Sequence, residues 1–281
     1  MYTINCFEQN KQIEKFYDLY HKLYLDIWGN YDNLALHMGY YDTSIKSHEE
    51  SLLRLNEIIF DMAKIRQNDL VLDAGCGVGG SSIWLAKLKG CKVIGISLAK
   101  KEIKLARKFA KQNKVDNIIR FEAMNMIKTN FSDNFFNVII AIESTCYIIN
   151  KLFFLKEASR ILKQGERLII SDYFFNKSYS LTEKYYMNCI NKESSINLCS
   201  FEEFENLMKL SGFGDIKQYN ISSNIKESYE KGIIKLSKLI ETVTDPLLKK
   251  EILEEKKRNS LELFCLNRKI LHYGIVSAIK I

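Results

Sequence analysis

The chain has 281 residues, 47% of them hydrophobic, a net charge of +7, and seven cysteines without a C-x-x-C pair. This length and composition allow one large domain, or one domain with a sizeable insertion, and exclude a disulfide framework, a zinc ribbon or another metal site with recognisable ligand spacing. Because the lysines are dispersed and no stretch approaches about 18 uninterrupted apolar residues, we expect a soluble, cytoplasmic protein that neither binds nucleic acid nor inserts stably into a membrane.

The predicted elements alternate through the middle of the chain. Apolar and aromatic residues at helical intervals predict two N-terminal helices, over residues 8–30 and 49–65. We then expect strands at residues 69–75, 91–97, 118–124, 136–144 and 166–174, with helices at 81–90, 100–113 and 152–162. Because this alternation requires crossover connections, the sequence predicts an α/β fold with a Rossmann-like, doubly wound, mostly parallel sheet.

Beyond residue 175 the alternation stops and a mostly helical stretch follows. A helix begins with the capping box of Ser200 and Glu203 and ends near Gly212. Residues 215–222 could form a strand, two helices are expected within 225–268, and 270–280 should be the last strand. We therefore divide the chain into an N-terminal helical cap (1–66), a nucleotide-binding core (67–175), a helical lid for the substrate with one possible strand (176–268), and a strand that completes the sheet (269–281).

A glycine-rich loop, LVLDAGCGVGG, joins the first expected strand to its helix. Gly75, Gly77 and Gly80 have the spacing G-x-G-x-x-G, which lets the backbone approach a ligand at a helix N-terminus. A dinucleotide enzyme carries an acid about 20 residues further on to bind the ribose, but here the second strand ends at Ser97. Asp73 would repel a pyrophosphate and attract a cation. The loop therefore favours a ligand with a positive end, and a nicotinamide oxidoreductase stays as an alternative.

This combination resembles the first motif of the class I S-adenosylmethionine-dependent methyltransferases. The resemblance implies that Asp73 lies near the methionine ammonium and that the backbone at Gly75, Cys76 and Gly77 packs against the cofactor. One branch of the family carries Thr-Leu-Ser-x-x-Gln after the second strand, and the segment from Ser97 is similar, with Glu102 in the place of Gln. The resulting ribose-side candidates are Ser97, Leu98 and Glu102.

Residues 121–139, FEAMNMIKTNFSDNFFNVI, resemble the adenine-binding loop and fourth strand of these enzymes. Asn125 stands at the place of an acid, and its side-chain carbonyl can accept a hydrogen bond from the adenine amino group. Met126 follows it as a second cofactor candidate. Asn137 replaces another acid and no proline precedes Phe131, so the motif is altered at three places. The structural alternative at Asn125 is an ordinary Asx turn.

Two segments resemble the branch that contains sterol, tocopherol, sarcosine/dimethylglycine and natural-product methyltransferases. Residues 141–148, AIESTCYI, are similar to its I-E-[AS]-x-x-H, and the aromatic pattern from Tyr17 to Trp28 is similar to its N-terminal segment. The resemblance implies methyl transfer from S-adenosylmethionine to a small, hydrophobic acceptor at O, N or C, with S-adenosylhomocysteine as product. It adds Tyr17, Trp28 and Glu143 to the cofactor-side candidates.

The catalytic candidates are Glu143, Tyr147 and His37. Methyl transfer is an in-line displacement that chiefly requires alignment in a dry pocket, and the aromatic-rich lid and N-terminal segment predict an apolar one. Glu143 ends a buried strand, where a carboxylate without a role would be costly. Tyr147 replaces the histidine of relatives and could face the sulfonium; further aromatic candidates are Tyr24, Tyr40 and Tyr41. The fold could also bind the cofactor without catalysis, or catalyse a cyclisation or rearrangement.

Overall fold

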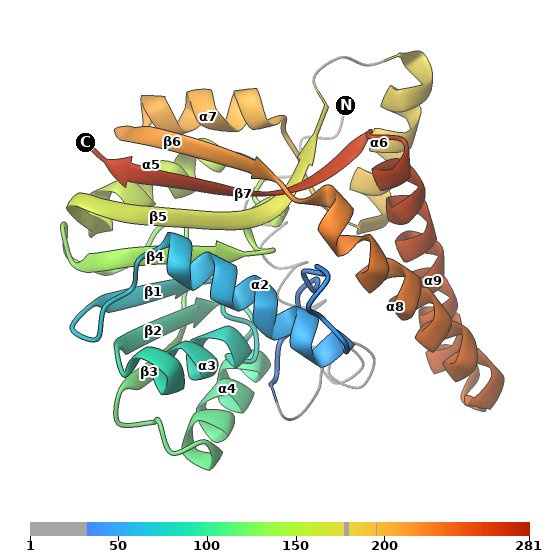
Figure 1. The fold of residues 1–281 in the computed structure, drawn as a ribbon, viewed down its shortest axis with the longest axis horizontal. Coiled ribbons are helices and arrows are strands. Elements are labelled where there is room, and N and C mark those ends of the chain that lie inside the picture. The colour runs from blue at the N-terminus through green and yellow to red at the C-terminus, as the bar shows by residue number, and fades with distance from the viewer. Residues whose placement is uncertain (1–32, 177–179, 195) are drawn as a thin grey trace.

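The computed structural model describes residues 33–176, 180–194 and 196–281. Its centre is a seven-stranded sheet in the order β3-β2-β1-β4-β5-β7-β6, flanked by helices (Figure 1). The strands are β1 (Leu70–Ala74), β2 (Lys92–Ser97), β3 (Ile119–Ala123), β4 (Phe136–Ile142), β5 (Leu162–Phe175), β6 (Phe213–Asn220) and β7 (Leu271–Lys280). Strands β1 to β5 pair in parallel, and β7 runs antiparallel to β5 and β6. The predicted doubly wound, mostly parallel α/β fold is confirmed.

The helices agree with the expected alternation. They are α2 (His48–Met62), α3 (Gly80–Lys89), α4 (Lys100–Gln112), the short 3-10 helix η1 (Thr145–Tyr147), α5 (Lys151–Ile161), α6 (Leu181–Ser194), α7 (Phe201–Leu210), α8 (Ser222–Thr242) and α9 (Pro246–Asn267). The capping box of Ser200 and Glu203 is formed at α7. The helix expected over residues 8–30 lies outside the described residues. Within the described chain, no helix combines the length and apolar character needed to cross a membrane.

The sheet carries a hydrophobic core on each face, because successive side chains of a strand point to opposite sides. Val71 of β1 packs into a cluster with residues of α2, α3 and α4. The next residue, Leu72, packs into a second cluster with residues of α5 and α7. Both side chains are at most 1% exposed. The short apolar run of β1 is thus the signature of a strand covered on both faces.

The stretch 176–268, expected as a helical lid with one possible strand, contains α6, α7, β6, α8 and α9. The possible strand near 215–222 is β6, and it pairs with β7 as an edge strand of the main sheet. Helix α7 packs on the same sheet through the buried side chains of Phe204 and Met208. In the described part of this stretch, α8 and α9 contact β7 and extend side by side from the end of the sheet where the parallel strands terminate (Figure 1).

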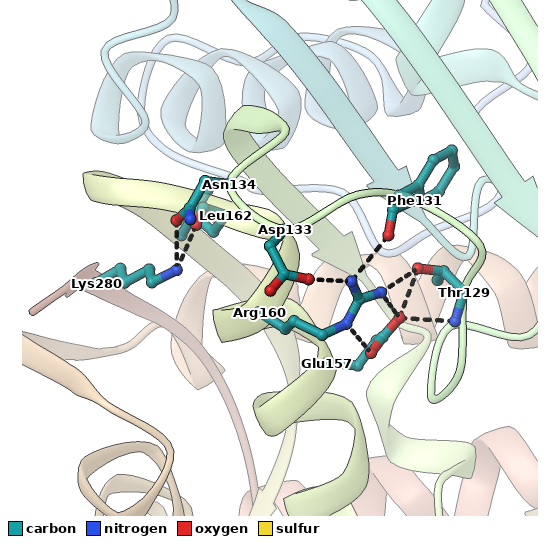
Figure 2. A network of polar contacts seen from close by, with 8 residues as sticks. All are labelled: Thr129, Phe131, Asp133, Asn134, Glu157, Arg160, Leu162 and Lys280. Carbon is teal, nitrogen blue, oxygen red and sulfur yellow. Dashed lines mark hydrogen bonds and ion pairs between the residues drawn. The ribbon is translucent and has the colours of Figure 1, made fainter.

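A network of hydrogen bonds and ion pairs connects the loop between β3 and β4 to α5 (Figure 2). The Arg160 guanidinium donates to both oxygens of Glu157 at 2.9 and 2.7 Å, and to the Phe131 carbonyl at 2.8 Å. Glu157 also accepts hydrogen bonds from the backbone N–H and hydroxyl of Thr129. Lys280 of β7 bonds the Asn134 side chain and the Leu162 carbonyl nearby. These contacts fix the loop that continues from Asn125.

Candidate functional site

A cavity of about 200 Å³ opens where β1, β2 and β4 end. The crossover helices of β1 and β2 lie on one face of the sheet and α5 lies on the other, so the chain leaves a crevice at this point, the usual ligand site of such folds. All cofactor-side candidates within the described residues line the cavity: Asp73, Gly75, Cys76, Gly77, Ser97, Leu98, Glu102, Asn125, Met126 and Glu143. Tyr17 and Trp28 lie outside the described residues.

The glycine loop combines an unusual backbone with very close packing. Gly75 and Gly77 have φ of +98° and +50°, which favour glycine. A Cβ on Gly75 would lie 2.3 Å from the Cβ of Ser144, and a Cβ on Gly80 would lie 2.2 Å from the carbonyl oxygen of Leu34. The hydroxyl of Ser144 in turn donates to the Ala74 carbonyl at 2.7 Å. The loop is therefore pressed between the end of β4 and the segment that precedes α2.

Asp73 is held inside the protein at the end of β1. Its side chain is 2% exposed and accepts a hydrogen bond from the Ser82 hydroxyl at 2.6 Å. Burial raises the pKa of Asp73 to about 6, and the hydrogen bond from Ser82 opposes this increase. Because no basic side chain of the described residues forms an ion pair with this carboxylate, a cationic group of a ligand in the cavity would stabilise its charged form.

Ser97 and Glu102 form one unit at the start of α4. The Ser97 hydroxyl donates to Glu102 at 2.9 Å and accepts from the Ala99 N–H at 3.2 Å. Glu102 is only 3% exposed although it belongs to a helix whose other charged residues face the solvent. An ionised carboxylate accepts hydrogen bonds only, so the group suits a ligand that offers hydroxyl donors, such as a ribose.

Asn125 forms the Asx turn that its position in the sequence allows. Its side-chain oxygen accepts a hydrogen bond from the Ile127 N–H at 3.1 Å. A carbonyl oxygen has a second lone pair, so the same atom can also accept a hydrogen bond from a ligand. Asn137 is different, since its side chain accepts from the Leu70 N–H and from Lys163 and does not line the cavity. Its role is to join neighbouring strands.

A second cavity, of about 110 Å³, lies against the first. The two share Leu36, His37, Glu143 and Tyr147, so all three catalytic candidates stand at the boundary between them. The far wall of the second cavity comes from α8 and α9 and presents Ser228, Glu255, Arg258, Asn259 and Glu262. This polar wall differs from the apolar pocket expected from the aromatic residues. The reason is that Phe264 of α9 packs against Tyr186 of α6, while Glu255, Arg258 and Glu262 of the same helix face the cavity.

Glu143 is held in a strained, buried position directly after β4. Its φ is +46°, a conformation that costs a non-glycine residue roughly 1 kcal/mol or more. One carboxyl oxygen accepts hydrogen bonds from the Met38 N–H and the Tyr273 hydroxyl, both at 2.7 Å. Tyr273 also accepts from Ser171 of β5. Burial raises the pKa of Glu143 to about 8, which allows the carboxyl group to gain or lose a proton near neutral pH.

His37 is a neutral side chain in this position. Its Nδ1 lies 2.9 Å from the Met38 carbonyl, which can only accept, so Nδ1 carries the proton and Nε2 keeps its lone pair. Burial lowers the pKa of His37 to about 4. An interaction with the side-chain amide of the neighbouring Asn56 opposes this decrease, and Nε2 itself is buried. His37 can thus accept a hydrogen bond at the boundary of the cavities, but it does not supply a positive charge.

Sequence reasoning missed several residues around Glu143 and included others that lie elsewhere. Tyr40 and Tyr41 do not line either cavity; the Tyr41 hydroxyl bonds His48 Nδ1 at 2.8 Å. Ser144 and Tyr273 were not predicted, because no local pattern connects Tyr273 with a carboxylate 130 positions away. In the described part of the chain, no group of three His, Cys, Asp or Glu side chains is placed to hold a metal ion.

The sequence is similar to that of several known methyltransferases. A family model described as a methyltransferase domain matches residues 65–233. The chain is 32% identical over 162 residues to 27-O-demethylrifamycin SV methyltransferase of Amycolatopsis mediterranei, covering 58% of each chain. It is 28% identical over 235 residues to the chloroplastic tocopherol O-methyltransferase of Arabidopsis thaliana, covering 76% of this chain and 66% of that one. The matches therefore span less than two thirds of the length of these curated relatives.

Solved structures show the same fold. The cyclopropane synthase MmaA2 of Mycobacterium tuberculosis superposes with a TM-score of 0.86 at 12% identity, over 96% of this chain and 98% of that chain. The [4+2]-cyclase SpnF superposes with a TM-score of 0.83 at 18% identity, over 96% of each chain. Because the family model matches more than half of the 281 residues, this chain belongs to the methyltransferase domain family.

Proposed function

We propose that this protein transfers a methyl group from S-adenosylmethionine to a small organic acceptor and releases S-adenosylhomocysteine. The observation that carries the proposal is the convergence of three separate sequence segments on one cavity. Asp73, the pair Ser97–Glu102, and Asn125 all line it. They offer, respectively, a carboxylate for a cationic end, acceptors for hydroxyl groups, and an acceptor for an amino group. No single one of these features distinguishes the cofactor, but together they match its three parts.

The residues present fit this cofactor. Asp73 is a buried carboxylate whose raised pKa reports an environment that lacks a compensating positive charge. The positive φ of Gly75 and its contact with Ser144 leave backbone, not side chain, at the wall of the cavity. Asp73 would hold the ammonium group, Glu102 the ribose and Asn125 the adenine. When bound, S-adenosylmethionine supplies an activated methyl group on a positively charged sulfur.

The protein's own contribution lies at the boundary between the two cavities. The residues that enclose the two cavities can align the acceptor with the methyl group and exclude water from it. Glu143 can take a proton from an acceptor hydroxyl or amine, because its pKa of about 8 lies near neutral pH. His37 Nε2 is a second acceptor for such a proton donor. Tyr147 presents an aromatic ring and a hydroxyl at the same place.

The second cavity supports a more specific description of the acceptor. Proteins that are similar to this chain in sequence are named as methyltransferases of a rifamycin, of tocopherol and of sterols. We infer a small natural product with a hydrophobic framework and at least one hydroxyl or amine group, because Glu143, Glu262 and Asn259 line the chamber where it would lie. The dispersed lysines and scattered cysteines support an enzyme of the cytoplasm without a nucleic-acid partner.

Calorimetric titration with S-adenosylhomocysteine and, in parallel, with NAD and NADH tests the cofactor. We expect micromolar binding of S-adenosylhomocysteine and none of the nicotinamide cofactors; the reverse result would overturn the proposal. Incubation with methyl-labelled S-adenosylmethionine and a panel of phenols, polyketides, prenols and amines tests the chemistry. Conversion of an acceptor without consumption of S-adenosylmethionine would indicate a cyclisation or rearrangement in place of methyl transfer.

A further inference from the structure

Lys151, the first residue of α5, has its ammonium group enclosed by backbone carbonyls. Its side chain is buried, with only 6% of the residue exposed. The Nζ atom lies 2.8 Å from the carbonyl oxygen of Thr145, 2.8 Å from that of Ile148 and 2.5 Å from that of Asn197, with Cys146 at 3.5 Å. Within the described part of the chain, this Nζ forms no ion pair with a carboxylate. The group is therefore surrounded by carbonyl dipoles, as an alkali cation is in a carbonyl-lined site.

The number of close carbonyls shows that Lys151 is protonated. An ammonium has three N–H donors, whereas a neutral amine has two N–H donors and a lone pair. With three carbonyl oxygens within 2.8 Å, the neutral form would direct its lone pair at one of them. Burial lowers the pKa of Lys151 below its ordinary value, and the charge of the nearby Asp172 carboxylate opposes this decrease. The carbonyl contacts replace hydrogen bonds that the ammonium would make to water.

The enclosed ammonium holds a segment that forms the wall of both cavities. Residues 144–149 include Tyr147, at the boundary of the cavities, and Ile148, beside the first one. The segment bends around Nζ so that two of its carbonyls point inward, and the third close carbonyl comes from Asn197, ahead of α7. Asp172 of β5 holds the outer side, where it accepts from the Thr145 hydroxyl and the Cys146 N–H.

Without a cation at this point, three carbonyl oxygens would face one another in a buried space. Their mutual repulsion and lost hydrogen bonds would favour a different path for residues 144–149. Asn197 fastens the same segment from outside, because its N–H donates to the Cys146 carbonyl at 2.7 Å and its side chain donates to the Ile149 carbonyl at 2.5 Å. These bonds keep the carbonyls near one another, so a free cation of suitable size could restore the enclosure after the lysine side chain is removed.

We propose that the Lys151 ammonium acts as a built-in monovalent cation that shapes residues 144–149, and that a Lys151→Ala protein binds NH4+ or K+ in its place. Lys151 is thus a positioning residue that acts through the segment carrying Tyr147. This inference rests on the proposed function only in the experiments that measure cofactor binding.

The test compares Lys151→Ala with Lys156→Ala, which removes a solvent-exposed lysine from the same helix. Thermal unfolding and S-adenosylhomocysteine affinity are measured at equal ionic strength in ammonium, potassium and choline chloride. In choline we expect Lys151→Ala to melt below the wild type and to bind S-adenosylhomocysteine about tenfold more weakly. Ammonium and potassium should restore most of both losses. The wild type and Lys156→Ala should give the same values in all three salts.

Lys151→Met provides a second variant, because its side chain fills the space of the lysine and leaves no room for an ion. It should be impaired in every salt. The proposal is overturned if Lys151→Ala equals the wild type in choline, or if its losses are the same in all three salts. Should Lys151→Ala not fold in choline, its yield of refolding in ammonium chloride decides the question. If even the wild type does not bind S-adenosylhomocysteine, the proposed function fails, while cation-dependent unfolding still tests the role of Lys151.

Discussion

The two sides of the site are built in different ways. On the cofactor side, Asp73, Gly75 and Glu102 come from a continuous stretch of 30 residues, and close backbone packing shapes the wall. On the acceptor side, Glu143 meets the Met38 N–H and the Tyr273 hydroxyl, contacts that span 105 and 130 positions of the chain. The first side is recognisable as a motif because its parts are neighbours in sequence. The acceptor side forms only when the folded sheet places the end of β4 and the start of β7 at the same end of the sheet.

This difference predicts that substitutions on the first side impair cofactor binding, whereas those on the second impair turnover. The largest effect on binding is expected from Gly75→Ala, because its Cβ would lie 2.3 Å from that of Ser144. We expect the affinity for S-adenosylhomocysteine, measured by calorimetry, to fall at least about 100-fold. Gly165→Ala is the control, since Gly165 also has a positive φ but nothing within 4 Å of the added Cβ. It should lose roughly 1 kcal/mol of stability and no affinity. Equal effects of the two variants would contradict the packing argument.

On the acceptor side, Glu143→Gln should reduce the rate constant of methyl transfer by about 100-fold and leave the affinity for S-adenosylhomocysteine nearly unchanged. Glutamine keeps an oxygen that can accept from Tyr273 and Met38, but it cannot take a proton. The wild-type rate should rise with pH through about 8, where Glu143 loses its proton, and the residual rate of the variant should not. Stopped-flow single-turnover kinetics measure this step. An unchanged rate constant would show that Glu143 only holds the segment around Met38.

The same variant should change how stability depends on pH. Folding raises the pKa of Glu143 from 4.5 to about 8, so the folded state binds the proton more tightly than the unfolded state between these values. The free energy of unfolding from this group therefore falls as pH rises, by about 2 kcal/mol over a range of about two pH units below 8. Urea unfolding should show this slope in the wild type relative to Glu143→Gln. Parallel curves for the two proteins would place the pKa of Glu143 near its ordinary value.

The sequence predicts more of the cofactor side than of the acceptor side for a physical reason. The alternation of strands and helices and the glycine spacing are set by local backbone and burial requirements, and these elements are found in the structure. The polar wall formed by Glu255, Arg258 and Glu262 depends on how α9 is rotated against α6 and α8, which its helical pattern does not determine. The sequence does not predict the enclosure of Lys151 either, because backbone carbonyls form it and every residue type has a backbone carbonyl.

A smaller effect is expected for Asp73→Asn, about tenfold in the affinity for S-adenosylhomocysteine at neutral pH. Because the pKa of Asp73 is raised to about 6, the carboxyl group becomes charged as pH rises through this value, and only the charged form attracts an ammonium. Wild-type affinity should therefore increase from pH 5 to pH 7, and the variant should show no such increase. Ser82→Ala removes the hydrogen bond that lowers this pKa and should move the midpoint upward. The same loss for Asp73→Asn at both pH values would instead indicate a structural role.

The smallest effect should come from Asn125, where one oxygen serves both the fold and the ligand. Asn125→Ala removes the Asx turn to the Ile127 N–H together with the acceptor for the adenine amino group, and we expect a loss of about fivefold in affinity. Asn125→Asp keeps both acceptor functions and should bind at least as well as the wild type. A titration with the inosine analogue of S-adenosylhomocysteine, which lacks the amino group, separates the two roles. If Asn125→Ala weakens the adenine and inosine compounds equally, the residue acts through its turn alone, and the cofactor side would then distinguish its ligand chiefly by the cationic end and the ribose.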